Sequence, residues 1–433
     1  MDGQLSPGTV ITTQAQITYR VVSWLGAGGQ GEVYDVESGG QHKALKWYFP
    51  DKALPQQLEI LNRLVELGAP DSAFLWPEDL VLDPQGKRFG YIMGLRPKNY
   101  KGLQDLLKCR INPSFEALCR TAFNLVRAYE KLHAQGNCYR DISFGNLFFD
   151  PNTGDVLICD NDNVAPSDMP GMVLGTPRFM APEIVRGEAQ PSRKTDQFSL
   201  AVLLFYIFMV AHPLDGKREN DIKCYDIPAQ NKLYGTNPLF IFDPNDSSNR
   251  PVPGVQDNAL IYWPMYPKEL QDLFTESFTV GLMNPKKRVA ENRWLVVLGN
   301  MLGGIVRCPK CGAEVFFNDA RPSASRCWNC GSTVSMPPVL AIGKRQRLLL
   351  RPNAALPTYL IDDGRCRYDI ETVSGTVVRN PKNPALLGLR NDSPNNWTYI
   401  KTDGTHLVVA PGKTAGIAKG AKIDFGMKTG EFN

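Results

Sequence analysis

The most informative stretch of the chain reads Tyr139-Arg140-Asp141-Ile142-Ser143-Phe144-Gly145-Asn146. Asp141 precedes Asn146 by five residues, and Asp160 follows at the end of the short apolar run 157–159. A carboxylate such as that of Asp141 can orient an attacking hydroxyl, and an amide oxygen such as that of Asn146 can bind a metal ion. An aspartate at the end of a strand can hold the metal ion against phosphate oxygens. The spacing therefore predicts a metal-assisted reaction between a hydroxyl group and a phosphate compound.

A glycine-rich segment lies upstream and reads Leu25-Gly26-Ala27-Gly28-Gly29-Gln30-Gly31-Glu32-Val33-Tyr34. Gly26, Gly28 and Gly31 fit the pattern G-x-G-x-x-G, which Val33 extends to G-x-G-x-x-G-x-V. Glycines let backbone amides approach phosphate oxygens closely, because no Cβ intervenes. The pattern alone also occurs in dinucleotide-binding folds and in plain tight turns, but a dinucleotide fold would place a helix directly after the glycines. Residues 32–36 continue as a strand instead, which favours a β-hairpin lid.

Lys46 lies in the following strand, where an inward lysine can reach the α and β phosphates of a nucleotide. Most strand lysines are simply exposed, and Lys43 competes for the role, but alternation along a strand puts Lys43 and Lys46 on opposite faces. Apolar residues recur at helical spacing over 55–67, which predicts the one helix of this region. Glu59 in this helix is the expected ion-pair partner of Lys46, with Glu66 near the helix end as the rival.

A further segment, Gly175-Thr176-Pro177-Arg178-Phe179-Met180-Ala181-Pro182-Glu183, follows these elements in order. With it, residues 10–303 resemble the eukaryotic-like protein serine/threonine kinases. The resemblance implies an α+β, two-lobed protein kinase fold, with an N-lobe over about 10–93 and a C-lobe over about 95–303. It also implies a transferase that binds ATP between the lobes. The γ-phosphate would pass to hydroxyls of the chain itself and/or of a partner protein.

The resemblance further assigns roles to individual residues. Mg²⁺ (or Mn²⁺) would be held by Asn146 and Asp160, Glu183 would pair with Arg288, and Asp196 would brace the catalytic loop. Met93 would lie at the gate of the adenine pocket. The expected catalytic residues are Asp141, Lys46, Glu59, Asn146 and Asp160, and the expected nucleotide-binding residues are Gly26, Gly28, Gly31, Val33, Lys46 and Met93.

Three positions depart from the kinase pattern. Tyr139 stands in place of a histidine, Ser143 in place of a lysine, and Asp160-Asn161-Asp162 in place of Asp-Phe-Gly. Loss of the lysine charge is expected to slow phosphate transfer, and Asp162 adds a negative charge near the metal ions. These changes raise the alternative of a pseudokinase scaffold, which binds nucleotide and docks partners through its C-terminal modules. We favour the active enzyme, because the residues that handle ATP are all present.

The segment between Asp160 and Glu183 offers two hydroxyls of interest. Ser167 is a candidate phosphorylation site, since Arg140 could pair with a phosphate there. Thr176 is expected to contact Asp141 and the substrate.

Two cysteine pairs follow, at Cys308/Cys311 and Cys327/Cys330. The pattern C-x₂-C-x₁₅-C-x₂-C predicts a tetrahedral Cys₄ zinc site in a zinc ribbon over 304–336. Four thiolates leave no open coordination position, so the zinc is expected to be structural. Two disulfides are the alternative, which a reducing compartment disfavours.

The remaining segment, 340–433, has short strand-like runs separated by turns, which predicts a small all-β sandwich. Its last strands resemble those of forkhead-associated domains, and Arg365 is a candidate phosphothreonine ligand, but the S-x-x-H element of such sites is missing. Segments 234–242 and 249–251, with the cysteine pairs, resemble bacterial kinases of tellurite-resistance-type triads. That resemblance implies a von Willebrand A-domain protein as candidate substrate and a PP2C-type phosphatase as antagonist.

The bulk composition sets the remaining limits. The chain has 433 residues, 43% of them hydrophobic and 21% charged, which is typical of a globular protein with more than one domain. A net charge of +4 is too small to indicate nucleic acid. The longest apolar run, 200–210, is far shorter than the roughly 20 residues of a membrane span. We therefore expect a cytoplasmic protein without a membrane partner.

Overall fold

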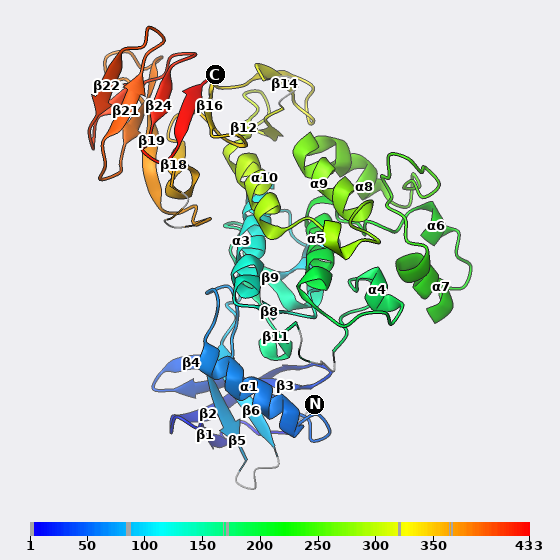
Figure 1. Cartoon of the computed structure of the whole chain (residues 1–433). Helices are drawn as coiled ribbons and strands as arrows, with labels where there is room; N and C mark the ends of the chain where they lie inside the picture. Colours follow the sequence, from blue (N-terminus) through cyan, green and yellow to red (C-terminus); the bar gives the residue numbers. More distant parts are fainter. Residues whose placement is uncertain are drawn as a thin grey trace. The chain divides into compact units, whose positions relative to one another are not determined.

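The computed structural model describes residues 4–83, 88–167, 169, 173–318, 322–362, 364 and 367–433. Two compact units make up the chain: Met1–Leu260 with Phe274–Glu291, and Ile261–Leu273 with Asn292–Asn433. Figure 1 labels their helices and strands. The kinase-like part and the C-terminal modules thus fall mainly into different units. The exact boundaries 10–303, 304–336 and 340–433 stay predictions.

A six-stranded antiparallel sheet opens the first unit, in the order β1-β2-β3-β4-β6-β5. The first two long strands, β2 and β3, form a hairpin around the glycine-rich turn, as the sequence predicted. The sheet buries an apolar cluster that includes Tyr34, Leu45 and Ile92. The strands are β1 (Val10–Thr12), β2 (Thr18–Ala27), β3 (Gly31–Ser38), β4 (Gln41–Tyr48), β5 (Asp79–Leu82) and β6 (Phe89–Gly94).

One helix, α1 (Pro55–Leu67), packs on this sheet, as predicted. Proline at its first turn suits the start of a helix, and Gly68 with φ +71° ends it. The helix buries Gln57, Ile60, Leu61 and Leu64, which share one face at the spacing i, i+3, i+4, i+7.

The rest of the first unit is mainly helical. α3 (Phe115–Ala134) begins at Ser114, whose side chain accepts a hydrogen bond from the N–H of Ala117. α5 (Arg193–Met209) begins with a capping box between Ser192 and Thr195, and its residues from Thr195 onward are buried. None of the described helices is long and apolar enough to cross a membrane.

Shorter elements complete the unit and carry the candidate site. Its short helices are α2 (Leu103–Leu107), α4 (Pro182–Val185), α6 (Lys217–Asn220) and α7 (Ile227–Asn231). Three further helices have residues in both units: α8 (Asp257–Tyr262), α9 (Lys268–Phe278) and α10 (Glu291–Gly303). The strands are β7 (Lys101–Gly102), β8 (Asn137–Cys138), β9 (Leu147–Phe149), β10 (Val156–Ile158) and β11 (Ala165–Pro166).

The second unit holds two small hairpins and a sandwich. The hairpins pair β12 (Ile305–Arg307) with β13 (Glu314–Phe316), and β14 (Ala324–Arg326) with β15 (Thr333–Ser335). The sandwich, predicted from the sequence as an all-β module, has a six-stranded sheet in the order β17-β16-β25-β24-β21-β22 and a four-stranded sheet in the order β18-β19-β20-β23. Its strands are β16 (Val339–Ile342), β17 (Gln346–Leu349), β18 (Ala355–Pro357), β19 (Val373–Arg379), β20 (Leu387–Asn391), β21 (Trp397–Ile400), β22 (His406–Val409), β23 (Thr414–Gly416), β24 (Lys422–Asp424) and β25 (Thr429–Phe432).

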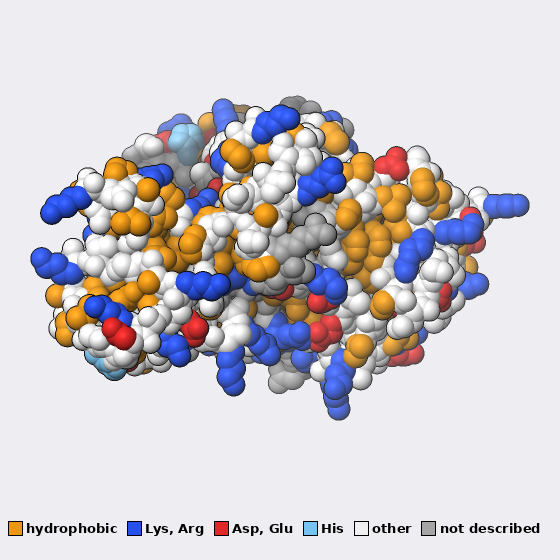
Figure 2. All heavy atoms as spheres, turned by 90° about the horizontal axis from the view of Figure 1, so that it is seen from above, with side chains coloured by type: hydrophobic (Ala, Val, Ile, Leu, Met, Phe, Trp, Pro, Cys, Tyr) orange, Lys and Arg blue, Asp and Glu red, His pale blue; other side chains and the backbone are white. Residues whose placement is uncertain are grey.

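The face seen in Figure 2 shows Lys and Arg side chains dispersed among apolar and uncharged ones. The candidate phosphothreonine ligand of the sandwich, Arg365, lies outside the described residues.

Candidate active site and four-cysteine cluster

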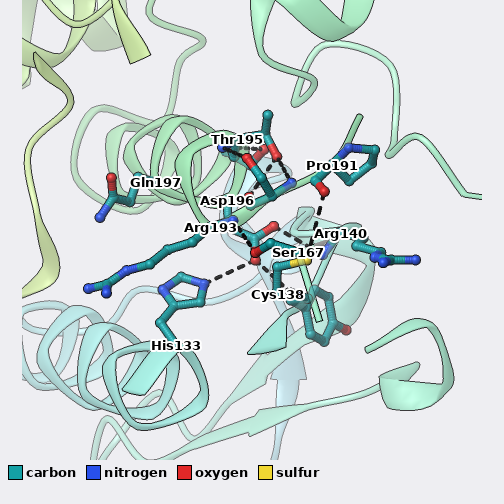
Figure 3. Close-up of polar contacts among 12 residues, drawn as sticks. His133, Cys138, Arg140, Ser167, Pro191, Arg193, Thr195, Asp196 and Gln197 are labelled. Carbon is teal, nitrogen blue, oxygen red and sulfur yellow. Dashed lines mark hydrogen bonds and ion pairs between the residues drawn. The ribbon is translucent and has the colours of Figure 1, made fainter. Parts of the chain in front are cut away.

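Asp196 anchors the segment that carries Asp141. Its carboxylate accepts hydrogen bonds from the backbone N–H of Tyr139 at 2.6 Å and of Arg140 at 3.0 Å. Figure 3 shows Asp196 between His133 and the segment 138–140. Asp196 is 1% exposed, so these bonds are shielded from water. The expected brace of the catalytic loop is confirmed.

His133 extends the same buried network. Its Nε2 lies 3.0 Å from Oδ2 of Asp196, and its Nδ1 lies 2.6 Å from Oε1 of Glu291. Burial opposes the charged imidazolium, but the two carboxylates outweigh it and raise the pKa of His133 to about 9. Burial also opposes ionisation of Glu291, yet its bonds to His133 and Arg193 lower its pKa well below the usual range. Sequence spacing did not reveal His133 and Glu291 as partners of Asp196, because these residues lie far apart along the chain.

Asp141 is held by two neighbours. The amide nitrogen of Asn146 donates to the backbone oxygen of Asp141 at 3.0 Å and to its Oδ2 at 3.3 Å. The hydroxyl of Thr176 donates to Oδ1 of Asp141 at 2.6 Å, which confirms the expected contact. Both hydrogen bonds of the Asn146 side chain use its nitrogen, so within the described residues its amide oxygen is the atom left for a metal ion.

Asp160 follows β10, and its backbone has the left-handed conformation, with φ +51° and ψ +49°. Non-glycine residues in this region carry strain, which is often found at functional sites. Its side chain is 48% exposed, and its Oδ1 lies 3.3 Å from Nζ of Lys46. Burial and the neighbouring Asp162 raise the pKa of Asp160, although Lys46 opposes the rise. A carboxylate and an amide oxygen are donors that suit a divalent cation, and the backbone N–H of Cys159, the residue before Asp160, donates to the backbone oxygen of Asn146 at 2.9 Å.

Lys46 lies on β4 and is buried, with 4% exposure. Its ammonium donates to Gln30 at 3.0 Å and forms ion pairs with Asp160 at 3.3 Å and Asp162 at 2.7 Å. Burial favours the neutral amine, but the two aspartates outweigh it and raise the pKa of Lys46. Lys43, the competitor, pairs instead with Glu78 near the surface at 2.8 Å. The two lysines therefore lie on opposite faces, as alternation predicted.

The prediction that Glu59 pairs with Lys46 is wrong in this structure. Glu59 is exposed, as is its rival Glu66, whereas the buried face of α1 presents Gln57. The amide of Gln57 donates to the backbone oxygen of Asp162 at 2.7 Å. Glu59 lies two residues from Gln57, which is about 200° around the helix, and so points to another side.

The three glycines of the lid are not equivalent. A Cβ built on Gly26 or Gly28 meets nothing within 4 Å, which leaves open space above the turn. A Cβ on Gly31 would lie 2.3 Å from the backbone oxygen of Trp47. Gly26 and Gly28 therefore leave room for a phosphate group, and Gly31 is required for close packing of β3 on β4.

Val33 and Met93 belong to one apolar cluster of the first unit. Val33 pairs with Lys46 in the register of β3 and β4, and Met93 on β6 pairs with Ala44. Both residues are thus near the lysine, and their contact with an adenine ring stays a prediction.

The predicted pair of Glu183 and Arg288 is present. Two parallel bonds of 2.7 Å join the guanidinium of Arg288 to the two carboxylate oxygens of Glu183. Arg288 also donates to the backbone oxygens of Gly281 and Lys194. This pair ties α4 to the segment before α10.

The exposed Ser167 follows β11, close to two arginines. Its hydroxyl accepts a hydrogen bond from the N–H of Arg193 at 3.4 Å. The guanidinium of Arg140 donates to the backbone oxygens of Pro166 and Met169. Figure 3 shows Arg140 and Ser167 near the same network. Phosphorylation of Ser167 stays a prediction.

The four cysteines of the second unit gather in one cluster. Their sulfur atoms all lie within 4.8 Å of one another, with 3.7 Å between Cys308 and Cys330 and 3.6 Å between Cys311 and Cys327. All four cysteines are free thiols in the structure, and the two distances are well above the S–S bond length of about 2.05 Å. A tetrahedral zinc ion with Zn–S bonds of about 2.3 Å separates its sulfurs by about 3.8 Å. The cluster therefore has the dimensions of a tetrahedral metal site.

The two cysteine turns are built alike. The N–H of Gly312 donates to the oxygen of Cys308, and that of Gly331 to the oxygen of Cys327, both at 2.9 Å. Both glycines have positive φ, +74° and +71°, which favours glycine at the end of each turn.

Comparison with known proteins gives a consistent result. Residues 91–292 match the family model described as "Protein kinase domain". The chain is 28% identical over 229 residues to the DNA damage-responsive serine/threonine-protein kinase RqkA of Deinococcus radiodurans, which covers 50% of this chain and 33% of the relative. It is 30% identical over 198 residues to the probable serine/threonine-protein kinase PkwA of Thermomonospora curvata, which covers 43% of this chain and 26% of the relative.

The chain thus spans about a third or less of the length of these two relatives. Both relatives are named as serine/threonine-protein kinases, one of them as probable, and the family match contains Asp141, Asn146 and Asp160. Residues 91–292 are therefore similar to protein kinase domains, and the two relatives to which the chain is similar are named as serine/threonine-protein kinases.

Proposed function

We propose that this chain is a protein serine/threonine kinase that transfers the γ-phosphate of ATP to hydroxyls of itself and/or of a partner protein. One observation carries the proposal. Three separate segments supply Lys46, the pair Asp141 and Asn146, and Asp160, and direct contacts join Lys46 to Asp160 and Asn146 to Asp141. These are the groups that phosphate transfer from ATP requires.

Each group has a defined task in the proposed reaction. Asp141 accepts the proton of the substrate hydroxyl and orients its oxygen, in the place where it now accepts the bond from Thr176. Lys46 holds the α and β phosphates, and the open turn at Gly26 and Gly28 leaves room for backbone contacts to them. Asn146 and Asp160 would hold Mg²⁺ (or Mn²⁺), which when bound neutralises charge on the phosphates.

The four-cysteine cluster is proposed as a structural zinc site. The sulfur distances support zinc, and four thiolates leave no open position for catalysis. The short hairpins bury few apolar side chains, namely Ile305, Val315, Phe316 and Val334. Zinc would then supply much of their stability.

The finer assignment to the tellurite-resistance-type triads is also a proposal. It rests on the segments 234–242 and 249–251 and on the cysteine pairs. It names a von Willebrand A-domain protein as substrate and a PP2C-type phosphatase as antagonist, in the cytoplasm, with an FHA-like sandwich at the end of the chain.

Radioactive phosphate transfer with the purified full chain and Mg-ATP tests the function. Candidate partners and the chain itself serve as acceptors, with Asp141→Ala and Asp160→Ala as variants and calorimetric Mg-ATP binding measured in parallel. We expect transfer by the wild type and loss in both variants. A wild type that binds Mg-ATP but labels neither itself nor any partner would establish the pseudokinase scaffold instead.

A further inference from the structure

Lys46, the candidate ATP-binding lysine, pairs with the carboxylate of Asp162, which lies in a loop and not on helix α1. The Nζ of Lys46 lies 2.7 Å from Oδ2 of Asp162, closer than the 3.3 Å to Asp160. The side chain of Asp162 is fully buried and that of Lys46 is 6% exposed. A buried ion pair of this kind fixes the position of both partners, because breaking it leaves an uncompensated buried charge.

Two more side chains fix Asp162 in this place. The hydroxyl of Tyr48, on the same strand as Lys46, donates to Oδ2 of Asp162. The amide of Gln57 donates to the backbone oxygen of Asp162 at 2.7 Å. Asp162 is therefore attached to both the sheet and α1.

Helix α1 supplies no charged side chain to the ion pair of Lys46 and Asp162. Its buried residue nearest to the pair is Gln57, whose amide is neutral, and the carboxylate of Glu59 is exposed. Asn161, which precedes Asp162 in the loop, is also buried and donates to the backbone oxygens of Leu75 and Ile158, at 2.8 and 3.0 Å. These bonds secure the loop that carries Asp162.

From this geometry we propose that Asp162 is the positioning residue of Lys46, taking the task that the sequence suggested for Glu59. The inference rests on the proposed kinase function. Because Asp162 follows Asp160 by two residues, the lysine and the metal-binding aspartate are positioned by one loop. Loss of the Glu59 carboxylate then has no direct effect on Lys46, whereas movement of the loop 160–162, to which α1 is joined through Gln57, affects both groups together.

The test compares three variants of the full chain: Asp162→Asn, Glu59→Gln, and the double variant Asp162→Asn/Gln57→Glu. The double variant moves the carboxylate from the loop to the helix position that faces it. We measure kcat and KM for ATP, the dissociation constant of Mg-ATP, and the thermal midpoint of each variant.

Asp162→Asn is expected to lower kcat/KM by about 10²-fold, the effect of misplacing a group by about 1 Å. Glu59→Gln is expected to stay within about twofold of wild type, and the double variant to regain a large part of the loss. Equal losses in Asp162→Asn and Glu59→Gln, or wild-type kinetics in Asp162→Asn, would overturn the inference. So would a double variant that recovers its thermal midpoint but not its kinetics, because Asp162 would then act only on stability.

The binding measurement separates this inference from the proposed function. If the wild type transfers no phosphate, weaker Mg-ATP binding in Asp162→Asn but not in Glu59→Gln still supports the positioning role. Equal Mg-ATP affinity in all variants contradicts it, whether or not transfer occurs.

Discussion

The imidazole of His133 lies between two buried carboxylates and contacts Asp196 at 3.0 Å, on the side opposite Glu291. Asp196 in turn holds the backbone before Asp141. The imidazole of His133 thus directly contacts Asp196, the carboxylate that holds the catalytic loop.

The pH dependence of stability follows from this arrangement. The pKa of His133 is raised to about 9 in the folded chain, above the value of about 6.5 in an unfolded chain. Its stabilising effect is therefore complete below about pH 6.5 and is lost as the pH rises through about 9. We expect the thermal midpoint of the wild type to fall over this range, and His133→Gln to lack that fall. His42, which is exposed, gives the matched control variant His42→Gln. A fall of the same size in His133→Gln would contradict the assignment.

Because Glu183 and Arg288 form a buried bidentate ion pair, we expect a single substitution in this pair to lower the free energy of unfolding strongly. Glu183→Gln leaves a buried guanidinium without its counter-charge, which should cost about 3–5 kcal/mol. Arg288→Lys should also destabilise, because an ammonium cannot make two parallel bonds to one carboxylate. Thermal and urea unfolding measure both variants. The exposed carboxylate of Glu188, paired with Arg186, provides the control Glu188→Gln, for which we expect no change. Similar midpoints in Glu183→Gln and Glu188→Gln would show that the buried pair contributes little.

Two glycines of the lid are expected to respond differently to the same substitution. In Gly31→Ala the new methyl group meets the backbone oxygen of Trp47, so the variant should lose about 1–3 kcal/mol of stability. In Gly28→Ala the methyl group enters open space, so stability should persist while the KM for ATP rises. Thermal midpoints of the two variants measure the change in stability, and steady-state kinetics measure the change in KM for ATP. If Gly28→Ala changed only stability and Gly31→Ala only KM, the assignment of the two glycines would be reversed.

The sequence predicted those parts of the site that local spacing determines. The link from Asp141 to Asn146 lies within one loop, and the hairpin lid and the helix 55–67 follow from turn residues and periodicity. The partner of Lys46 was missed because it depends on the rotation of α1 against the sheet. The spacing of apolar residues located the helix, but it did not show that the buried amide of Gln57 faces the loop that carries Asp162.

The role of Asp162 also depends on contacts between distant parts of the chain, so the sequence predicted only that it adds charge near the metal ions. A carboxylate two residues after Asp160 has no visible partner in the sequence, because Lys46 and Tyr48 lie more than a hundred positions earlier. Only the fold brings β4 and this loop together. His133 was missed for a like reason, since Asp196 and Glu291 reach it from distant helices.

The four-cysteine cluster leads to the last prediction, which concerns metal removal. We expect about one zinc ion per purified chain, lost in Cys308→Ser and on treatment with a strong chelator. Backbone amides of β12 to β15 should then exchange with deuterium much faster, because the hairpins bury few apolar side chains. Strands β2 to β4 should keep their protection, since their core lies in the other unit. The variant Cys224→Ser, which changes an exposed cysteine outside the cluster, should keep both zinc and protection. Unchanged exchange of β12 to β15 after complete metal loss would mean that the apolar contacts suffice, and a chain purified without zinc would remove the basis for a structural metal site.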